Sequence, residues 1–148
     1  MQDLDKVCWG IIGCGDVTEM KSGPAFNKVP HSRLVAVMRR NASKAADYAA
    51  RHEVDQWYAD ATELINDSSV NAIYIATPPA SHLLYARMAM EAGKPVYVEK
   101  PMAMDANEAI QMADLATDKN VKLTVAHYRR GHERILYIKK LLDNKAIG

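Results

Sequence analysis

The sequence predicts an α/β domain with a doubly wound parallel sheet, in which helices cover both faces to give three α/β/α layers. Two observations support this prediction. Short apolar or β-branched runs alternate with longer segments of helical period, which is the pattern of βαβ units. A glycine-rich turn directly follows the first of these runs. The chain has 148 residues, enough for one such domain, and we assign residues 1–148 to it.

Strands and helices are expected in strict alternation. The strands are predicted at residues 7–12, 34–38, 56–58, 72–76, 96–98 and 121–126. The helices are predicted to start near residues 17, 42, 60, 81 and 105, and the last runs from about 133 to 144. Right-handed crossovers arrange such strands in the order 3-2-1-4-5-6 and bring their carboxyl ends to one edge, where ligands bind. Binding residues are therefore expected just after each strand.

Local signals support several helix boundaries. Asp60 and Asp105 are predicted N-caps, because a carboxylate accepts hydrogen bonds from the exposed N–H groups of a first turn. A glutamate follows each of them at the spacing of a capping box. Gly93 is predicted to end the fourth helix. The Gly23-Pro24 pair is expected to break or kink the first helix, since proline lacks a backbone donor.

The composition excludes several classes of protein. The formal net charge is +1, so neither nucleic acid nor a membrane is an expected partner. No apolar run approaches the roughly 20 residues that span a bilayer, and the polar start does not resemble a signal peptide. Cys8 and Cys14 lack the spacing of a zinc site, so no metal is expected. They are predicted to be reduced thiols of a cytoplasmic protein, with a disulfide as the alternative.

The glycine turn indicates a dinucleotide site. The candidate phosphate contacts are Gly13, Cys14, Gly15, Asp16 and Val17, which with Thr18 form a G-x-G-x-x-T version of the dinucleotide fingerprint. Gly13 permits a tight turn, and Gly15 lets the backbone approach a pyrophosphate at the positive end of the following helix. Thr18 is larger than the usual Gly or Ala. A plain turn is the alternative, but the position inside a βαβ unit favours the nucleotide.

The end of the second strand indicates which dinucleotide is preferred. A carboxylate there would bond the adenosine ribose and repel a 2′-phosphate. This chain instead has Arg39 and Arg40, and no carboxylate appears before Asp47. Guanidinium groups suit a phosphate through forked, charge-assisted hydrogen bonds. We therefore expect NADP to be preferred, with NAD also possible; two solvated arginines at a helix entrance are the alternative.

Three further clusters follow later strands. They are Thr77-Pro78-Pro79 with His82, Glu99-Lys100-Pro101, and His127-Tyr128-Arg129-Arg130. The order G-I-I-G-C-G-D-V, I-A-T-P-P-x-x-H and G-K-P-V-Y-V-E-K-P resembles the glucose–fructose oxidoreductase / inositol dehydrogenase (Gfo/Idh/MocA) family over nearly the whole chain. The resemblance implies a Rossmann domain followed by a substrate domain on a mostly antiparallel sheet. It also implies reversible hydride transfer between a nicotinamide and a sugar, polyol or related compound.

The resemblance also implies roles for these residues. The adenosine and ribose path would be lined by Thr77, Pro78, Pro79 and His82. Glu99 would face the nicotinamide ribose, Lys100 the nicotinamide and the reacting oxygen, and Arg129 or Arg130 the carboxamide or substrate. The chemistry fits Lys100, because a cation near a carbinol oxygen stabilises alkoxide charge and a lysine can exchange the hydroxyl proton. A surface lysine paired with Glu99 is the alternative.

The leading interpretation is therefore the dinucleotide-binding half of an NADP-preferring oxidoreductase. The substrate domain, with the remaining acid/base residues, is expected to be absent from this chain, which would then be inactive alone. The complete protein is expected to act on a sugar-like molecule and to form a homo-oligomer. A non-catalytic dinucleotide-sensing or regulatory module is the alternative function.

Overall fold

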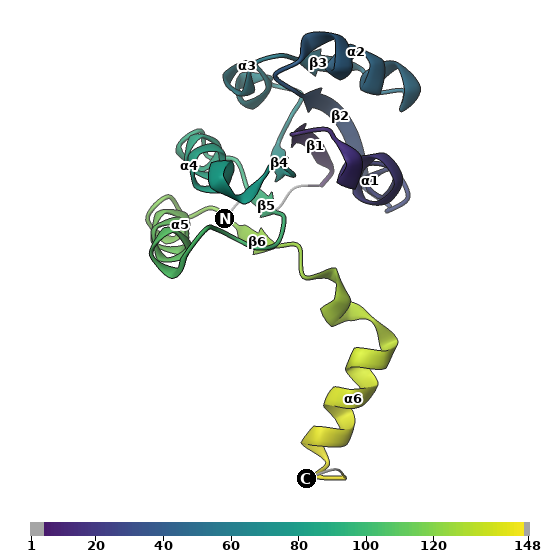
Figure 1. Cartoon of the computed structure of the whole chain (residues 1–148), viewed down its shortest axis with the longest axis vertical. Coiled ribbons are helices and arrows are strands. Elements are labelled where there is room, and N and C mark those ends of the chain that lie inside the picture. Colours follow the sequence, from purple (N-terminus) through teal and green to yellow (C-terminus); the bar gives the residue numbers. More distant parts are fainter. Residues whose placement is uncertain (1–4, 147–148) are drawn as a thin grey trace.

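The computed structural model describes residues 5–146 and contains one six-stranded parallel sheet in the order β3-β2-β1-β4-β5-β6 (Figure 1). The strands are β1 (Val7–Ile12), β2 (Ser32–Met38), β3 (Gln56–Tyr58), β4 (Ala72–Ile75), β5 (Val96–Val98) and β6 (Leu123–Val125). The predicted topology is confirmed. The expected bounds differ mainly at the last strand, which is shorter at both ends than residues 121–126.

Helices cover both faces of the sheet, as predicted. The regular helices are α1 (Gly23–Phe26), α2 (Ala42–Arg51), α3 (Ala61–Asn66), α4 (His82–Glu91), α5 (Ala106–Asp118) and α6 (Glu133–Asp143). Three short segments are η1 (Thr18–Ser22, a π-helix), η2 (Pro79–Ser81) and η3 (Tyr128–Gly131). In Figure 1, α1 and α2 lie on one side of the sheet and α3, α4 and α5 on the other. No helix within residues 5–146 is long and apolar enough to cross a membrane.

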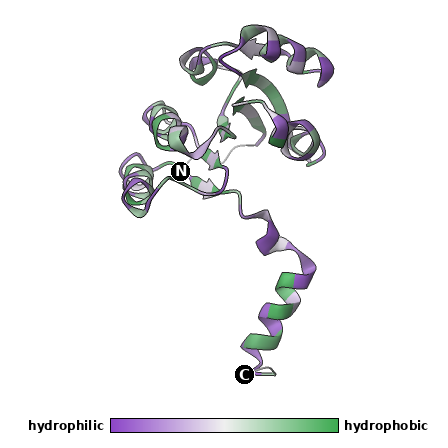
Figure 2. Cartoon of the chain, in the orientation of Figure 1, coloured by the Kyte–Doolittle hydropathy of each residue, from purple (hydrophilic) through white to green (hydrophobic). Residues whose placement is uncertain are grey.

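Side chains of the central strands alternate between two buried clusters, one under each helical layer. Ile11 and Tyr74 belong to the cluster that includes Tyr48 of α2, whereas Ile12 and Ile75 belong to the cluster under α3, α4 and α5. Because both faces are covered, the central strands are mostly apolar, and most of β2 is green in Figure 2. The buried sheet is the rigid base from which the loops at its carboxyl edge project.

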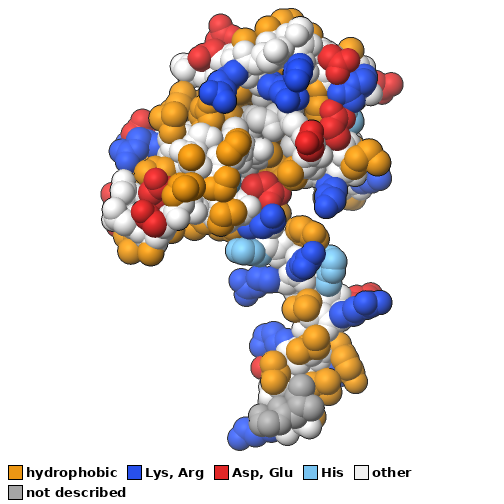
Figure 3. All heavy atoms as spheres, in the orientation of Figure 1, with side chains coloured by type: hydrophobic (Ala, Val, Ile, Leu, Met, Phe, Trp, Pro, Cys, Tyr) orange, Lys and Arg blue, Asp and Glu red, His pale blue; other side chains and the backbone are white. Residues whose placement is uncertain are grey.

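The last helix, α6, leaves this compact body and projects from it (Figure 1). Hydrophobic side chains gather along it in Figure 3, among them Ile135, Ile138 and Leu142, which are each about half exposed. The three lie at helical spacing on one face. This helix therefore contributes nothing to the cavity described below.

The first helix contains a π-turn where Gly23-Pro24 was expected to break or kink it. The Gly23 N–H donates to the carbonyl of Thr18, five residues earlier, and the helix then continues through Pro24 as α1. The Tyr48 hydroxyl also donates to the Thr18 carbonyl, at 2.9 Å. A side chain at position 23 would clash there, because its Cβ would overlap the Tyr48 hydroxyl. The helix therefore accommodates the proline through a wider turn: of the two expected outcomes, a break is not seen, and the irregularity at Gly23-Pro24 is the π-turn.

The predicted caps are largely confirmed. Asp105 accepts a hydrogen bond from the N–H of Glu108 at 2.9 Å, and Asp60 accepts one from Thr62 at 2.7 Å. Gly93 adopts a φ of 73° after α4, as the predicted end of that helix requires. Asn41, which the sequence analysis did not single out, caps α2.

An ion-pair network joins the π-turn to α2. The two carboxylate oxygens of Glu19 accept hydrogen bonds from Arg51 at 2.7 and 2.8 Å, and His52 Nε2 lies 2.7 Å from one of them. Arg51 also pairs with Asp47 at 2.9 Å. These partners, Arg51 foremost, lower the pKa of Glu19 from 4.5 to about 2.

We expect Glu19→Gln to lower the free energy of unfolding at pH 7 by about 0.5–1 kcal/mol, the magnitude of a well-formed surface pair. A carboxyl whose pKa is depressed by folding stabilises the fold above its unfolded value and loses that contribution as pH falls. The difference between wild type and variant should therefore shrink between pH 5 and about 2. Urea melts across this range measure it, with exposed Glu91→Gln as the control. An undiminished difference at pH 2 would contradict the assignment.

Candidate functional site

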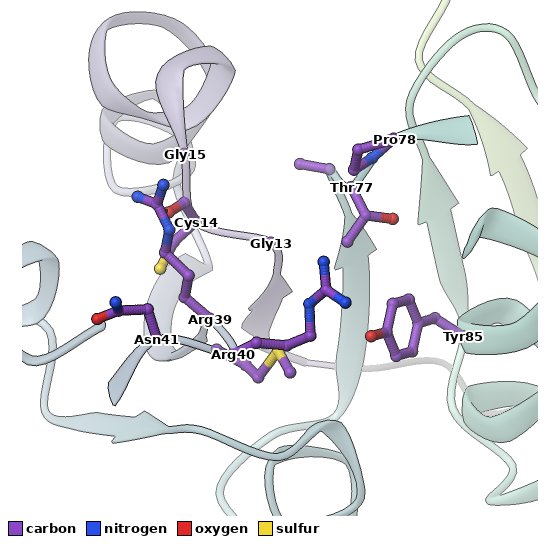
Figure 4. A pocket seen from close by; sticks show the side chains of 11 residues that line it. Gly13, Cys14, Gly15, Arg39, Arg40, Asn41, Thr77, Pro78 and Tyr85 are labelled. Carbon is purple, nitrogen blue, oxygen red and sulfur yellow. The ribbon is translucent and has the colours of Figure 1, made fainter. Parts of the chain in front are cut away.

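A cavity of about 340 Å³ opens at the carboxyl edge of the sheet (Figure 4). It is lined by Gly13, Cys14, Gly15, Met38, Arg39, Arg40, Asn41, Ala76, Thr77, Pro78 and Tyr85. Three loops meet there, namely those that follow β1, β2 and β4. The structure therefore brings the glycine turn, the arginine pair and the Thr77-Pro78 segment together, as the topological rule predicts.

The glycine turn forms the floor of the cavity. Gly13 has a φ of 92°, and a Cβ there would lie 2.6 Å from Cγ2 of Thr77, so only glycine fits. At Gly15 the nearest heavy atom to an added Cβ is 3.9 Å away, so the space above it is open to a ligand. Thr18 fits in full burial, and its hydroxyl donates to the Gly15 carbonyl at 2.7 Å. The larger side chain of Thr18 therefore stabilises the glycine turn through this hydrogen bond.

The neighbouring residues of the turn differ in exposure. Cys14 is completely buried, and burial raises the pKa of its thiol to about 11. The thiol therefore remains protonated at neutral pH, unlike a nucleophile or a metal ligand. Asp16 and Val17 are exposed at the start of the helical segment and do not line the cavity.

The two arginines that follow β2 reach different parts of the cavity. Arg39 bends toward the glycine turn, where its Nη1 donates to the Cys14 carbonyl at 3.3 Å. Arg40 is exposed, and Figure 4 shows its guanidinium extending into the space between Gly13 and Tyr85. Among the described residues that line the cavity there is no Asp or Glu, so its charged groups are both cationic.

Four lining residues were not predicted as site residues, namely Met38, Asn41, Ala76 and Tyr85. Met38 and Ala76 are the last residues of the predicted strands 34–38 and 72–76. Asn41 stands directly before α2, and its place at a helix start was a signal that could have identified it. Tyr85 reaches the cavity from the first turn of α4, and no sequence pattern distinguishes it from the other apolar residues of that helix. Figure 4 shows its ring on the side of the cavity opposite Asn41.

His82 lies behind the cavity wall. It is completely buried, with Nε2 at 2.8 Å from the Thr77 carbonyl and Nδ1 at 3.1 Å from the Pro101 carbonyl. The imidazole thus joins the loop after β4 to the loop after β5. Pro79, at the start of η2, is also outside the lining.

The predicted residues after β5 and β6 form a second group, outside the cavity. Glu99 is half-buried and Lys100 is exposed. Arg129 and Arg130 are exposed within η3. A hydrogen bond from Arg129, followed by the positive charges of Lys21 and Lys100, lowers the pKa of Tyr128. Lys100 and Arg129 therefore contribute to one positively charged region.

A parallel sheet in this order, with a glycine turn and basic groups at its carboxyl edge, defines the class of Rossmann domains that bind dinucleotides. The chain belongs to the GFO_IDH_MocA family: the model described as "Oxidoreductase family, NAD-binding Rossmann fold" matches residues 7–127. The family expected from the sequence is thereby confirmed.

Individual relatives agree with this assignment. The chain is 54% identical to "Oxidoreductase P35" of Formosa agariphila, over 97% of this chain and 44% of that protein. It is 30% identical to dTDP-3,4-didehydro-2,6-dideoxy-alpha-D-glucose 3-reductase of Saccharopolyspora spinosa, over 94% of this chain and 42% of that protein. The fold matches that of KijD10, a 3-ketoreductase from Actinomadura kijaniata in complex with TDP-benzene and NADP, with a TM-score of 0.89 and 24% identity. The match covers 97% of this chain and 45% of KijD10. The chain thus spans less than half the length of these relatives.

Proposed function

We propose that this chain is the dinucleotide-binding half of an NADP-preferring oxidoreductase. The complete enzyme transfers hydride between the nicotinamide and a sugar, polyol or related hydroxyl or carbonyl compound. Family membership supports the reaction class, and a relative named as a deoxy-sugar 3-reductase supports the substrate class. The homo-oligomer expected from the sequence remains part of this proposal.

The observation that carries the cofactor preference is the pair of arginines in a cavity whose described lining has no carboxylate. Arg39 and Arg40 follow the strand next to the glycine turn, where a dinucleotide places its adenosine ribose. Both are available to a 2′-phosphate, because neither is paired with a carboxylate among residues 5–146. Such a phosphate would gain charge-assisted hydrogen bonds that NAD cannot form.

The residues present fit a dinucleotide along the whole edge. The open space above Gly15 admits a pyrophosphate, and Thr77 and Pro78 form the facing wall. A bound nicotinamide would supply the hydride chemistry, at the carbon that carries the substrate oxygen. Lys100 stabilises negative charge on that oxygen through Nζ and exchanges the hydroxyl proton. The Glu99 carboxylate accepts hydrogen bonds from the hydroxyls of the nicotinamide ribose.

We expect Arg39→Asp to reverse the order of affinities for NADPH and NADH. The substitution removes a hydrogen bond to a charged group, worth about 1.5–3 kcal/mol, and adds a charge that repels the 2′-phosphate. NADPH should bind the variant at least roughly tenfold more weakly, while NADH binding is retained or improved. Side-by-side fluorescence titrations of both dinucleotides measure this.

Arg87→Asp is the matched control, because Arg87 lies on the exposed side of α4, away from the cavity. It makes the same change in net charge and should leave the ratio of affinities unchanged. Tighter NADH than NADPH binding by the wild type, or an unaltered ratio in Arg39→Asp, would remove the NADP assignment. Failure of the wild type to bind either dinucleotide would reject the proposed function.

A further inference from the structure

Tyr74 is a polar residue in the centre of the sheet. It lies in the middle of β4, is completely buried, and packs against Phe26 and Tyr97 with ring centroids 5.3 and 5.4 Å apart. An apolar side chain would fill such a position without a hydroxyl to satisfy. A buried hydroxyl is costly unless it is hydrogen-bonded, so the partners of this phenol bear on its role.

Those partners come from two different segments, the π-turn that follows the glycine turn and the loop that follows β5. The Tyr74 hydroxyl donates to Oε1 of Glu99 at 2.6 Å and lies 3.1 Å from the hydroxyl of Ser22. Burial and the neighbouring Glu99 carboxylate both raise the pKa of Tyr74, so the phenol keeps its proton and acts as the donor. The other oxygen of Glu99 accepts the backbone N–H of Lys100 at 3.1 Å.

The Glu99 carboxylate is therefore held by donors from two elements, one to each oxygen. The phenol comes from β4 and the amide from the residue after Glu99 itself. Each oxygen retains an acceptor site for a further hydrogen bond. A half-buried carboxylate without these donors would rotate among several rotamers, and ordering it on binding would weaken the interaction.

The π-turn completes the link to the glycine turn. The π-turn begins at Thr18 and ends at Ser22. The Thr18 hydroxyl donates a hydrogen bond to the carbonyl of Gly15, in the glycine turn. One buried phenol thus contacts both the helix that follows the glycine turn and the carboxylate that follows β5.

We propose that Tyr74 is a positioning residue that orients the Glu99 carboxylate toward the ribose on the nicotinamide side of the dinucleotide. This inference rests on the proposed function and adds a residue to it. Tyr74 touches no ligand in this arrangement, because it is completely enclosed. We expect its effect on affinity to pass through Glu99, its partner in the shorter hydrogen bond at 2.6 Å, rather than through Ser22 at 3.1 Å, and therefore to concern the nicotinamide half of the ligand.

The test is Tyr74→Phe, which keeps the ring and removes only the hydroxyl. The dinucleotide that the wild type binds more tightly should lose roughly three- to tenfold in affinity. The corresponding adenosine half, which lacks the second ribose, should bind as it does to the wild type. That half is adenosine 2′,5′-bisphosphate for NADPH or ADP for NADH. A purely structural role would change the affinities for both ligands together, or neither.

Two variants complete the design. Tyr97→Phe makes the same chemical change in the neighbouring ring and should alter neither affinity. In a Glu99→Gln background, Tyr74→Phe should have no further effect on dinucleotide affinity, since coupled residues are not additive. Equal losses for the dinucleotide and its adenosine half, an unchanged dinucleotide affinity, or additive losses in the double variant would each overturn the inference. Each leaves dinucleotide binding by the wild type, and so the proposed function, standing.

Discussion

Replacing Lys100 with Met is expected to lower kcat of the complete enzyme roughly 100- to 10,000-fold, the usual contribution of a positioned acid or base. The structure leaves Lys100 exposed at the carboxyl end of the sheet, next to Glu99, where a substrate bound against the nicotinamide would meet it. Methionine preserves length and removes both the charge and the exchangeable proton. Dinucleotide affinity should change little. Steady-state kinetics and a binding titration on the same preparation measure the two quantities.

Two further variants separate charge from proton exchange. Lys100→Arg keeps the cation but cannot be deprotonated, so it should restore electrostatic stabilisation only and alter the pH profile of kcat. Lys119→Met removes an exposed lysine just after α5 and should have no effect on kcat. Wild-type turnover in Lys100→Met, together with intact binding, would contradict the catalytic role assigned to Lys100.

The sequence was sufficient for the topology because the signals involved are local. Apolar runs such as 72–76 separate clearly from helical segments, and the crossover rule then fixes the strand order. The same rule predicts that Arg39, Arg40 and Thr77 lie together at one edge of the sheet, and all three line the cavity. Residues that directly follow a strand are easily predicted, since the fold alone decides where they lie.

The roles of residues that act through tertiary contacts could not be predicted from the sequence. Tyr74 reads as an ordinary strand residue, and only the packing of β4 against β5 and the π-turn brings its hydroxyl to Glu99. His82 was expected along the adenosine path, yet its bonds to two loop carbonyls place it in the interior. The Thr18 carbonyl, at the start of the π-turn, accepts a hydrogen bond from Tyr48, which lies 30 residues away in the chain. Long-range hydrogen bonds of this kind leave no periodic signal.

Gly13→Ala is the substitution with the largest expected effect on stability. Alanine at a φ of 92° is strained, and its Cβ would lie 2.6 Å from Cγ2 and 3.0 Å from the backbone nitrogen of Thr77. We expect a loss of about 2–4 kcal/mol, which lowers Tm by roughly 5–12 °C. The clash is relieved when the glycine turn moves away from Thr77, which changes the shape of the cavity. Dinucleotide affinity should therefore fall more than about tenfold.

Two other glycines separate the causes of this loss. Gly93 also has a positive φ, 73°, but an added Cβ there meets nothing within 4 Å, so Gly93→Ala should cost only the backbone strain and leave binding intact. Gly15→Ala creates no contact shorter than 3.9 Å, so it should leave Tm unchanged while its methyl group occupies the ligand space. Thermal melts with and without dinucleotide measure both effects. Wild-type dinucleotide binding by Gly15→Ala would show that the pyrophosphate does not approach this turn, and the proposed site would then be wrong.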